Sequence, residues 1–167
     1  MGCNSSSAAA TSATTTTSKT SAAQSQAAVA VPKKMAGKPS VAIIYYSTYG
    51  HILSLAKEVK AGLEAGGVSV DILQVQELLP EDVLSKMGAP AKPQDIATVT
   101  HDFVKKLPEY DGFMFGLPTR FGMMPAQMKS FLDSLGSLWQ EGKLIGKPVA
   151  TFVSTGTQQG GQETTHM

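Results

Sequence analysis

Short apolar runs alternate with segments of helical periodicity from residue 41 to the end of the chain. A continuous apolar run such as Val41 to Tyr46 is typical of a strand buried on both faces of a parallel sheet. After it, apolar residues recur at spacings of three and four between Ile52 and Leu63, which indicates a helix. The alternation predicts an α/β fold, a doubly wound parallel sheet with helices on both faces. The predicted strands are residues 41–46, 68–72, 112–116 and 148–153.

The predicted helices lie between these strands, at residues 52–65, 81–87, 95–107 and 128–135. Glycines act as stops after three of them, at Gly66, Gly88 and Gly136. Right-handed crossovers bring the carboxyl ends of all strands of such a sheet to one edge. Ligands bind at that edge in open parallel sheets, so the polar loops that follow the strands are the candidates for function.

Residues 1–40 differ in composition from the rest of the chain. They consist mostly of Ser, Thr, Ala and Gln, with four lysines and no acidic or aromatic residue. Such a segment buries too little apolar surface to offset the entropy lost on ordering, so we predict a disordered tail. The folded domain is expected at residues 41–167.

The tail begins Met1-Gly2-Cys3-Asn4-Ser5-Ser6, which fits the pattern for N-terminal myristoylation at Gly2. Cys3 would be a second acylation site for palmitate, and two lipid signals hold a membrane surface where one does so only marginally. Two alternatives stay open: a chance match of a Ser-rich N-terminus, and an organelle transit peptide, although the tail contains no arginine.

Composition excludes several other classes. The formal net charge of +1 gives no electrostatic footprint for nucleic acid. Cys3 is the only cysteine, so no internal disulfide can form, and His51, His101 and His166 lie too far apart for a metal-ligand pattern. No apolar stretch approaches the roughly 18 residues that a membrane-spanning helix needs. We therefore expect a cytoplasmic protein without a metal, with the lipidated tail able to anchor it to the cytoplasmic face of a membrane.

Three polar loops follow the first, third and fourth predicted strands, and they begin at Ser47, Pro118 and Ser154. The first loop leads into a helix N-terminus, where free amides and the helix dipole attract an anion such as phosphate. The alternative is ordinary helix capping, because Ser and Thr are the usual caps. No GxGxxG, Walker or GxSxG motif is present, so other phosphate loops and a serine nucleophile are excluded.

The residues of the three loops resemble the WrbA-type, flavodoxin-like NAD(P)H:quinone oxidoreductases (type IV). The resemblance rests on YYSTYGHI at residues 45–52, GLPTRFG at 116–122, and STGT followed by GGQE at 154–163. It implies bound FMN, NADH or NADPH as electron donor, quinones as small-molecule substrates, and a homo-oligomer, tetrameric in the family. No side-chain acid, base or nucleophile is then required, because the flavin carries the chemistry.

The same resemblance assigns roles to individual residues. The FMN phosphate would be held by Ser47, Thr48, Tyr49, Gly50, His51 and Ile52, with Tyr49 also near the nicotinamide cofactor. The isoalloxazine ring would be lined by Pro118, Thr119, Arg120, Phe121 and Gly122. Its pyrimidine end would be wrapped by Ser154, Thr155, Gly156, Thr157, Gln158 and Gln159. Trp139 would contact the ring-shaped substrate.

Ordinary structural roles remain as alternatives for several of these residues. Trp139 could be a core residue, Arg120 a surface salt-bridge partner, and His51 a helix-start residue without chemistry. Met123 and Met124 are expected to pack rather than to function.

Two functional alternatives also stay open. The chain could be a one-electron carrier, although flavodoxins are usually strongly acidic, or an inactive, membrane-anchored truncated isoform. The resemblance implies a fifth strand that the sequence lacks, so we expect residues 149–153 to form an unpaired apolar edge. Gln159 stands where the family is richer in glycine, and a positive φ there would cost energy.

Overall fold

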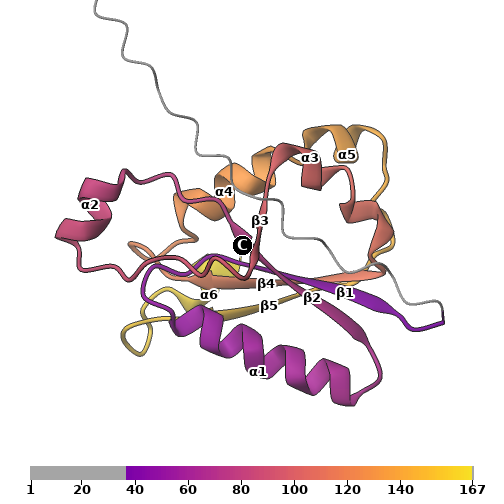
Figure 1. The fold of residues 1–167 in the computed structure, drawn as a ribbon, viewed down its shortest axis with the longest axis horizontal. Coiled ribbons are helices and arrows are strands. Elements are labelled where there is room, and N and C mark those ends of the chain that lie inside the picture. The colour runs from indigo at the N-terminus through magenta and orange to yellow at the C-terminus, as the bar shows by residue number, and fades with distance from the viewer. Residues whose placement is uncertain (1–36, 167) are drawn as a thin grey trace, which may run out of the picture.

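The computed structural model describes residues 37–166, and they form a five-stranded parallel sheet in the order β3-β2-β1-β4-β5 (Figure 1). The strands are β1 (Ser40–Tyr45), β2 (Ser69–Val75), β3 (Ala97–Val99), β4 (Gly112–Pro118) and β5 (Val149–Ser154). The helices are α1 (His51–Ala65), α2 (Glu81–Lys86), α3 (His101–Val104), α4 (Ala126–Asp133), α5 (Gly136–Gln140) and α6 (Gln162–His166), with a 3-10 turn, η1 (Leu107–Glu109).

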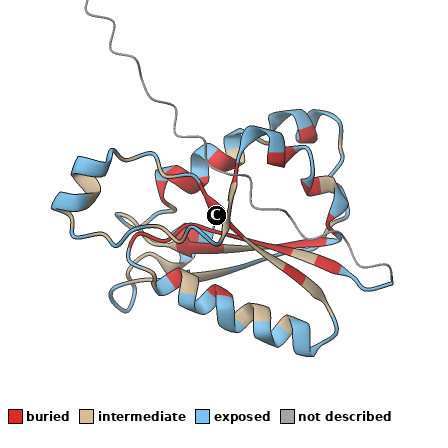
Figure 2. Ribbon diagram, viewed as in Figure 1, coloured by how far each residue is buried: buried red, intermediate tan, exposed pale blue. Residues whose placement is uncertain are grey.

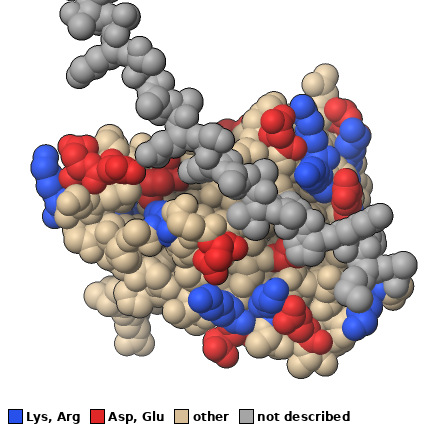
Figure 3. Space-filling view, in the orientation of Figure 1, with Lys and Arg blue, Asp and Glu red and all other residues tan. Residues whose placement is uncertain are grey.

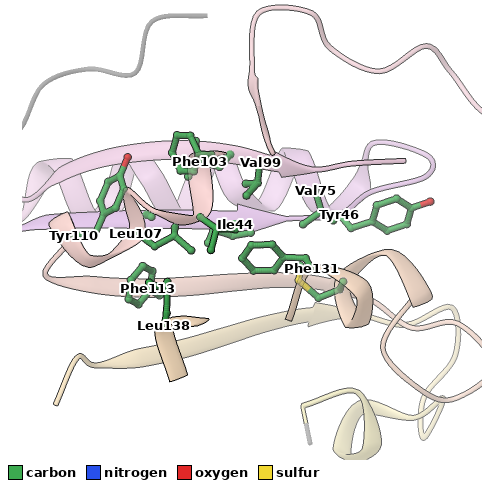
Figure 4. Packing of buried hydrophobic residues seen from close by; sticks show 14 of the residues in the cluster. Ile44, Tyr46, Val75, Val99, Phe103, Leu107, Tyr110, Phe113, Phe131 and Leu138 are labelled. Atoms are coloured by element: carbon green, nitrogen blue, oxygen red, sulfur yellow. The ribbon is translucent and has the colours of Figure 1, made fainter. Parts of the chain in front are cut away.

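Helices cover both faces of the sheet: α1 lies on one face, and α3, α4 and α5 lie on the other (Figure 1). Successive residues of β1 point to opposite faces, and this alternation divides the core in two. Ile44 packs with Phe113, Phe131 and Leu138 beneath α4 and α5 (Figure 4). Ile43 packs with the second cluster, against α1. The central strands β1 and β4 therefore carry most of the buried residues, whereas β5 and the outer helix faces are exposed or partly exposed, as Figure 2 shows.

The predicted flavodoxin-like parallel architecture is confirmed, but the number of strands was predicted wrongly. Residues 97–99, expected within a helix from Asp95 to Leu107, form the additional short edge strand β3. Thr98 and Val99 are β-branched and favour extended backbone, and Gln74 on β2 donates to Thr98 Oγ1 at 3.1 Å. Pairing with the open edge of β2 therefore prevails over the helical pattern.

Smaller differences occur at two glycine-marked boundaries. Gly136 was expected to stop a helix, and instead it is the first residue of α5, directly after the turn that ends α4. The end of the third polar loop was expected to be irregular up to Gln162, and a short helix, α6, begins there.

The carboxyl ends of β1, β4 and β5 lie at the same edge of the sheet, at the left in Figure 1, as the crossover rule predicts. The three polar loops therefore leave the sheet side by side. The predicted tail, with Gly2 and Cys3, lies almost wholly outside the described residues, since the structure describes the chain from Gly37. Within the described residues, no helix is both long and apolar enough to cross a membrane.

Packing is very close at Gly116 of β4, near this edge. A Cβ atom added there would lie 2.6 Å from the Phe152 ring and 2.8 Å from Ile52 Cγ2. We expect Gly116→Ala to lower the free energy of unfolding by about 1–3 kcal/mol, because overpacking forces neighbours out of their rotamers. Urea denaturation followed by circular dichroism measures this change.

Gly62→Ala is the matched control. Gly62 lies on α1, and an added Cβ would meet no atom within 4 Å. Alanine favours a helix over glycine by about 0.5–1 kcal/mol, so this variant should be more stable than the parent chain. Equal stability of both variants would contradict the packing described at Gly116.

Candidate functional site

The first loop ends at a helix N-terminus that no side chain caps. Gly50, the N-cap of α1, has φ 91° and makes no side-chain cap hydrogen bond. The first helical bond that Gly50 accepts comes from the Ser54 amide at 3.0 Å. The amides of residues 51–53 therefore have no partner in the helix and are available to an acceptor outside it.

Ser47 and Thr48 precede this helix and are both buried. The Ser47 hydroxyl accepts from the Gly50 amide at 3.0 Å, and Thr48 Oγ1 donates to the Tyr46 hydroxyl at 3.3 Å. Neither hydroxyl bonds to the first amides of α1, so the capping alternative is wrong for this loop. The hydroxyls shape the loop and leave the helix amides open.

The second loop contains a tight hairpin from Arg120 to Met123. The Arg120 amide donates to the Met123 carbonyl at 2.8 Å, and the Met123 amide donates back at 3.0 Å. The two central residues have positive φ, 50° at Phe121 and 76° at Gly122, as in a type I′ turn. A bulky residue in this conformation is strained, and the Phe121 side chain is completely exposed. Strain that presents an apolar ring to solvent points to a ligand-contacting role.

Two hydrogen bonds join the three loops to one another. Arg120 Nη2 donates to Thr48 Oγ1 at 3.3 Å, which connects the second loop to the first. The Thr119 amide donates to the Ser154 carbonyl at 3.1 Å, which connects the second loop to the third. Within the described residues Arg120 makes no ion pair, so the salt-bridge alternative for Arg120 is wrong.

The third loop is held by its own turn. Thr155 Oγ1 donates to the Thr157 carbonyl at 2.8 Å, and the Gly160 amide donates to the same carbonyl at 3.2 Å. Gln159 has φ 59°, so the energy cost expected for a positive φ at this position applies. Gly156, Thr157, Gln158 and Gln159 are exposed.

Helix α6 and the glycine before it contact the second loop. The Thr165 side chain is fully buried, and its hydroxyl lies 2.8 Å from that of Thr119. Thr164 Oγ1 donates to the Gly122 carbonyl. Gly161 has φ 97°, and a Cβ atom there would lie 2.6 Å from Gly122 Cα. This close backbone approach requires glycine.

A partly buried polar cluster lies under the first loop and centres on Glu77, whose side chain is 14% exposed. Its carboxylate accepts hydrogen bonds from the Tyr46 hydroxyl at 2.9 Å and from Gln127 Nε2 at 2.7 Å, and it pairs with Lys92 Nζ at 3.1 Å. Burial alone would raise the pKa of Glu77, but the hydrogen bonds from Gln127, the Leu79 amide, Lys92 and Tyr46 outweigh it. The pKa is therefore held below its ordinary value, and the carboxylate is ionised at neutral pH.

Tyr46 connects this cluster to the loops. Figure 4 shows its side chain extending away from the rest of the core cluster. Burial raises the pKa of Tyr46 to about 12, so the phenol stays protonated and can donate to Glu77. The resulting chain of hydrogen bonds runs from Arg120 through Thr48 and Tyr46 to Glu77.

The other residues named in the sequence analysis differ in exposure. Tyr49 and His51 are exposed at the start of α1, and the Tyr49 hydroxyl reaches toward the Met87 carbonyl at 3.5 Å. Met124 packs against the core as expected, whereas Met123 is exposed.

Trp139 is not a core residue, since its side chain is 84% exposed. It lies on α5, at the end of the sheet opposite the three loops (Figure 1). There it lines an apolar groove of about 610 Å³ with Leu132 and Ile145. The loops and Trp139 are therefore not brought together within one chain, and a substrate role for Trp139 stays a prediction.

Sequence reasoning missed Glu77, Lys92, Gln127 and the two threonines of α6. Glu77 could have been found, because it follows β2 closely at the carboxyl edge of the sheet. Lys92 lies in an irregular segment between α2 and β3, where no periodicity indicates its place.

The described residues contain no group of three or more metal-ligating side chains. Figure 3 shows positive and negative side chains interspersed on the face in view, without a block of one sign. The site therefore offers backbone amides and hydroxyls for an anion beside one exposed aromatic ring, an arrangement that suits a phosphorylated, planar ligand.

Comparison with known proteins agrees with the predicted resemblance. The family model described as NADPH-dependent FMN reductase matches residues 39–167. The chain is 56% identical over 125 residues to the NAD(P)H quinone oxidoreductase YCP4 of Candida albicans, a match that covers 75% of this chain and 42% of that relative. It is 56% identical over 126 residues to the quinone-oxidoreductase QR2 of Triphysaria versicolor, covering 75% and 60%.

A solved structure supports the fold. The flavodoxin, WrbA-like protein from Agrobacterium tumefaciens superposes with a TM-score of 0.55 at 22% sequence identity, covering 77% of this chain and 67% of that one. The chain spans about half the length of the curated relatives that it matches.

The partly buried Glu77 carboxylate makes stability depend on pH. Its pKa is lower in the folded protein than in the unfolded chain, so it adds stability above its ordinary value of 4.5. That stability is lost as the pH falls through the lower folded-state pKa. We expect the melting temperature to fall more steeply below pH 4.5 in the parent chain than in Glu77→Gln, which cannot titrate. Parallel curves for the two proteins, measured by circular dichroism from pH 7 to pH 3, would contradict this assignment.

Proposed function

Because the chain belongs to the NADPH-dependent FMN reductase family, we propose that it binds FMN across the three loops and reduces quinones to hydroquinones with NADH or NADPH. The observation that carries the proposal is the pairing of two features at one edge of the sheet. The first is the uncapped N-terminus of α1, and the second is the strained hairpin that exposes Phe121. FMN combines the matching parts, a phosphate and a planar aromatic ring.

The first loop would hold the phosphate. The amides of residues 51–53 have no helical partner, and the positive end of the α1 dipole favours an anion there. Gly50 has no atom within 4 Å of an added Cβ, which leaves open space above the loop. Arg120 adds a positive charge beside this loop, where its guanidinium donates to Thr48 Oγ1.

The second and third loops would receive the ring system. Phe121 offers an apolar surface to a planar ring, and Thr119 is fixed on both sides, by Ser154 and by Thr165. Exposed backbone amides of the third loop would donate to the polar pyrimidine end. Donors placed where negative charge develops stabilise a reduced ring without further rearrangement.

Bound FMN would supply the redox chemistry, accepting a hydride from the nicotinamide and passing two electrons to the quinone. The reaction balances as NAD(P)H, a proton and a quinone giving NAD(P)⁺ and a hydroquinone. The protein would contribute position and electrostatics. The relatives carry quinone oxidoreductase in their names, and they are longer, so turnover by this chain is part of the proposal.

The direct test is reconstitution of the purified 167-residue chain with FMN. We expect a yellow protein that oxidises NADH or NADPH only when a quinone is present, with one hydroquinone formed for each nucleotide. A carrier would instead pass single electrons to cytochrome c and form little hydroquinone. A chain that neither retains nor takes up FMN would refute the proposal.

Phe121→Gly is the sharpest variant for this test. Glycine adopts positive φ without strain, so the ligand-free variant should be as stable as the parent chain or more stable, by up to about 1 kcal/mol. Loss of the aromatic surface should weaken FMN binding, by about tenfold for a lost stacking contact of 1–1.5 kcal/mol. A variant that gains stability and keeps its FMN affinity would remove Phe121 from the binding site.

We also propose that acylation at Gly2 and Cys3 anchors the chain to the cytoplasmic face of a membrane, on the strength of the N-terminal sequence alone. In cells supplied with an alkyne-tagged myristate, the parent chain should become labelled and Gly2→Ala should not. Membrane association of the Gly2→Ala variant equal to that of the parent would rule out this anchor.

A further inference from the structure

Lys92 reaches into the site from a segment outside the three loops. Its ammonium group donates to the carbonyl oxygen of Ser47, pairs with Glu77 at 3.1 Å, and lies 4.6 Å from the centre of the Tyr46 ring. Its side chain is 24% exposed. Three separate contacts therefore hold one cation directly behind the first loop.

The amide that follows the Ser47 carbonyl has no partner. Thr48 is 5% exposed, and within the described residues its N–H donates to no acceptor. Backbone amides of buried residues are nearly always hydrogen-bonded, so the unpaired Thr48 amide, which lies beside an open helix N-terminus, is available to an acceptor that a ligand brings.

We propose that Lys92 is a positioning residue that fixes the orientation of the Ser47–Thr48 peptide and so aims the Thr48 amide at the FMN phosphate. This inference rests on the proposed function. In a trans peptide the C=O and N–H groups point in opposite directions, and the described residues contain no cis peptide. Because Lys92 holds the carbonyl on its own side, the N–H must face away from Lys92.

The alternative orientation of this peptide would be harmful to an anion site. If the peptide rotated, the Ser47 carbonyl oxygen would replace the Thr48 N–H, and its partial negative charge would repel phosphate. Such a rotation needs changes only at the ψ of Ser47 and the φ of Thr48, and neither residue lies in a helix or strand. A charged donor on the carbonyl is therefore needed to keep one orientation.

Glu77 holds Lys92 in place for this task. The carboxylate is itself fixed by Tyr46, Gln127 and the amides of Leu78 and Leu79. Because Glu77 neutralises much of the lysine charge, the proposal assigns Lys92 a directional role and not simply a positive potential. If Lys92 acts by direction, Glu77→Gln should weaken the phosphate contribution, because Lys92 loses the partner that holds it. If Lys92 acts only through its charge, Glu77→Gln should strengthen that contribution, because the neutralising carboxylate is removed.

The experiment compares affinity for FMN with affinity for riboflavin, which lacks the phosphate, by quenching of flavin fluorescence. The ratio of the two affinities isolates the phosphate contribution and is insensitive to general loosening of the ring site. We expect Lys92→Met to lower the ratio by about tenfold, the equivalent of one charge-assisted hydrogen bond. Lys92→Arg, which keeps a charged donor, should restore most of it.

Lys60→Met is the matched control. Lys60 also donates to a backbone carbonyl, that of Val70 at 3.0 Å, and pairs with a glutamate, Glu64, at 3.3 Å. It lies in the second half of α1, away from the loops, so its replacement should leave the ratio unchanged. Thermal melting shows whether each variant is folded. If Lys92→Met does not fold, the comparison of Lys92→Arg and Glu77→Gln with the parent chain provides the test.

The outcomes separate the two proposals. A lower ratio in both Lys92→Met and Glu77→Gln supports the positioning role. An unchanged ratio in Lys92→Met overturns it, and so does a raised ratio in Glu77→Gln, which would mean that Lys92 acts through its charge alone. A parent chain that binds FMN no better than riboflavin, or binds neither, would refute phosphate recognition by the first loop and this inference with it.

Discussion

The absence of a side chain at Gly116 determines where the first loop lies. Ile52, the second residue of α1, is fully buried and packs into the space that a Cβ at Gly116 would fill. The ring of Phe152 on β5 packs into the same space. The Gly116 carbonyl also accepts from the Tyr46 amide at 3.1 Å, at the point where β1 ends. These contacts press the start of α1 against β4, so the open helix amides stand beside the loops that follow β4 and β5.

The polar cluster of Glu77 and Lys92 beneath the first loop adds little to the free energy of folding. When a charged pair is removed from water, the attraction between the two charges offsets the free-energy cost of desolvation only narrowly, and often incompletely. Glu77 and Lys92 could be replaced by apolar side chains in a protein that only had to fold. Their contacts run instead to the Ser47 carbonyl and, through Tyr46, to Thr48. The cluster therefore makes sense as a support that orders a loop whose own residues must remain available to a ligand.

The sequence predicted what local periodicity and loop chemistry determine. The parallel strands and the loops after β1, β4 and β5 follow from residue types in short windows. It could not predict β3, because Thr98 and Val99 pair with an edge that exists only in the folded sheet. Nor could it predict Lys92 or the direction of Trp139, since both depend on how distant segments pack. The strained backbone at Phe121 could not be predicted, because a phenylalanine between arginine and glycine is typical of an ordinary loop.

The position of the third loop within the sheet has a consequence for how firmly a flavin could be held. This loop leaves β5, which lies at the edge of the sheet and pairs only with β4 within the described residues. The expected exposure of this edge is seen at Val149, which is 59% exposed. The third loop therefore depends on two other supports: the Thr119–Ser154 hydrogen bond, and α6, which bonds to Thr119 and Gly122 through Thr165 and Thr164. An element that paired with the free edge of β5 would stiffen this loop without touching the ligand, so affinity for the ring would rise while the phosphate contribution, set by the first loop, would stay the same.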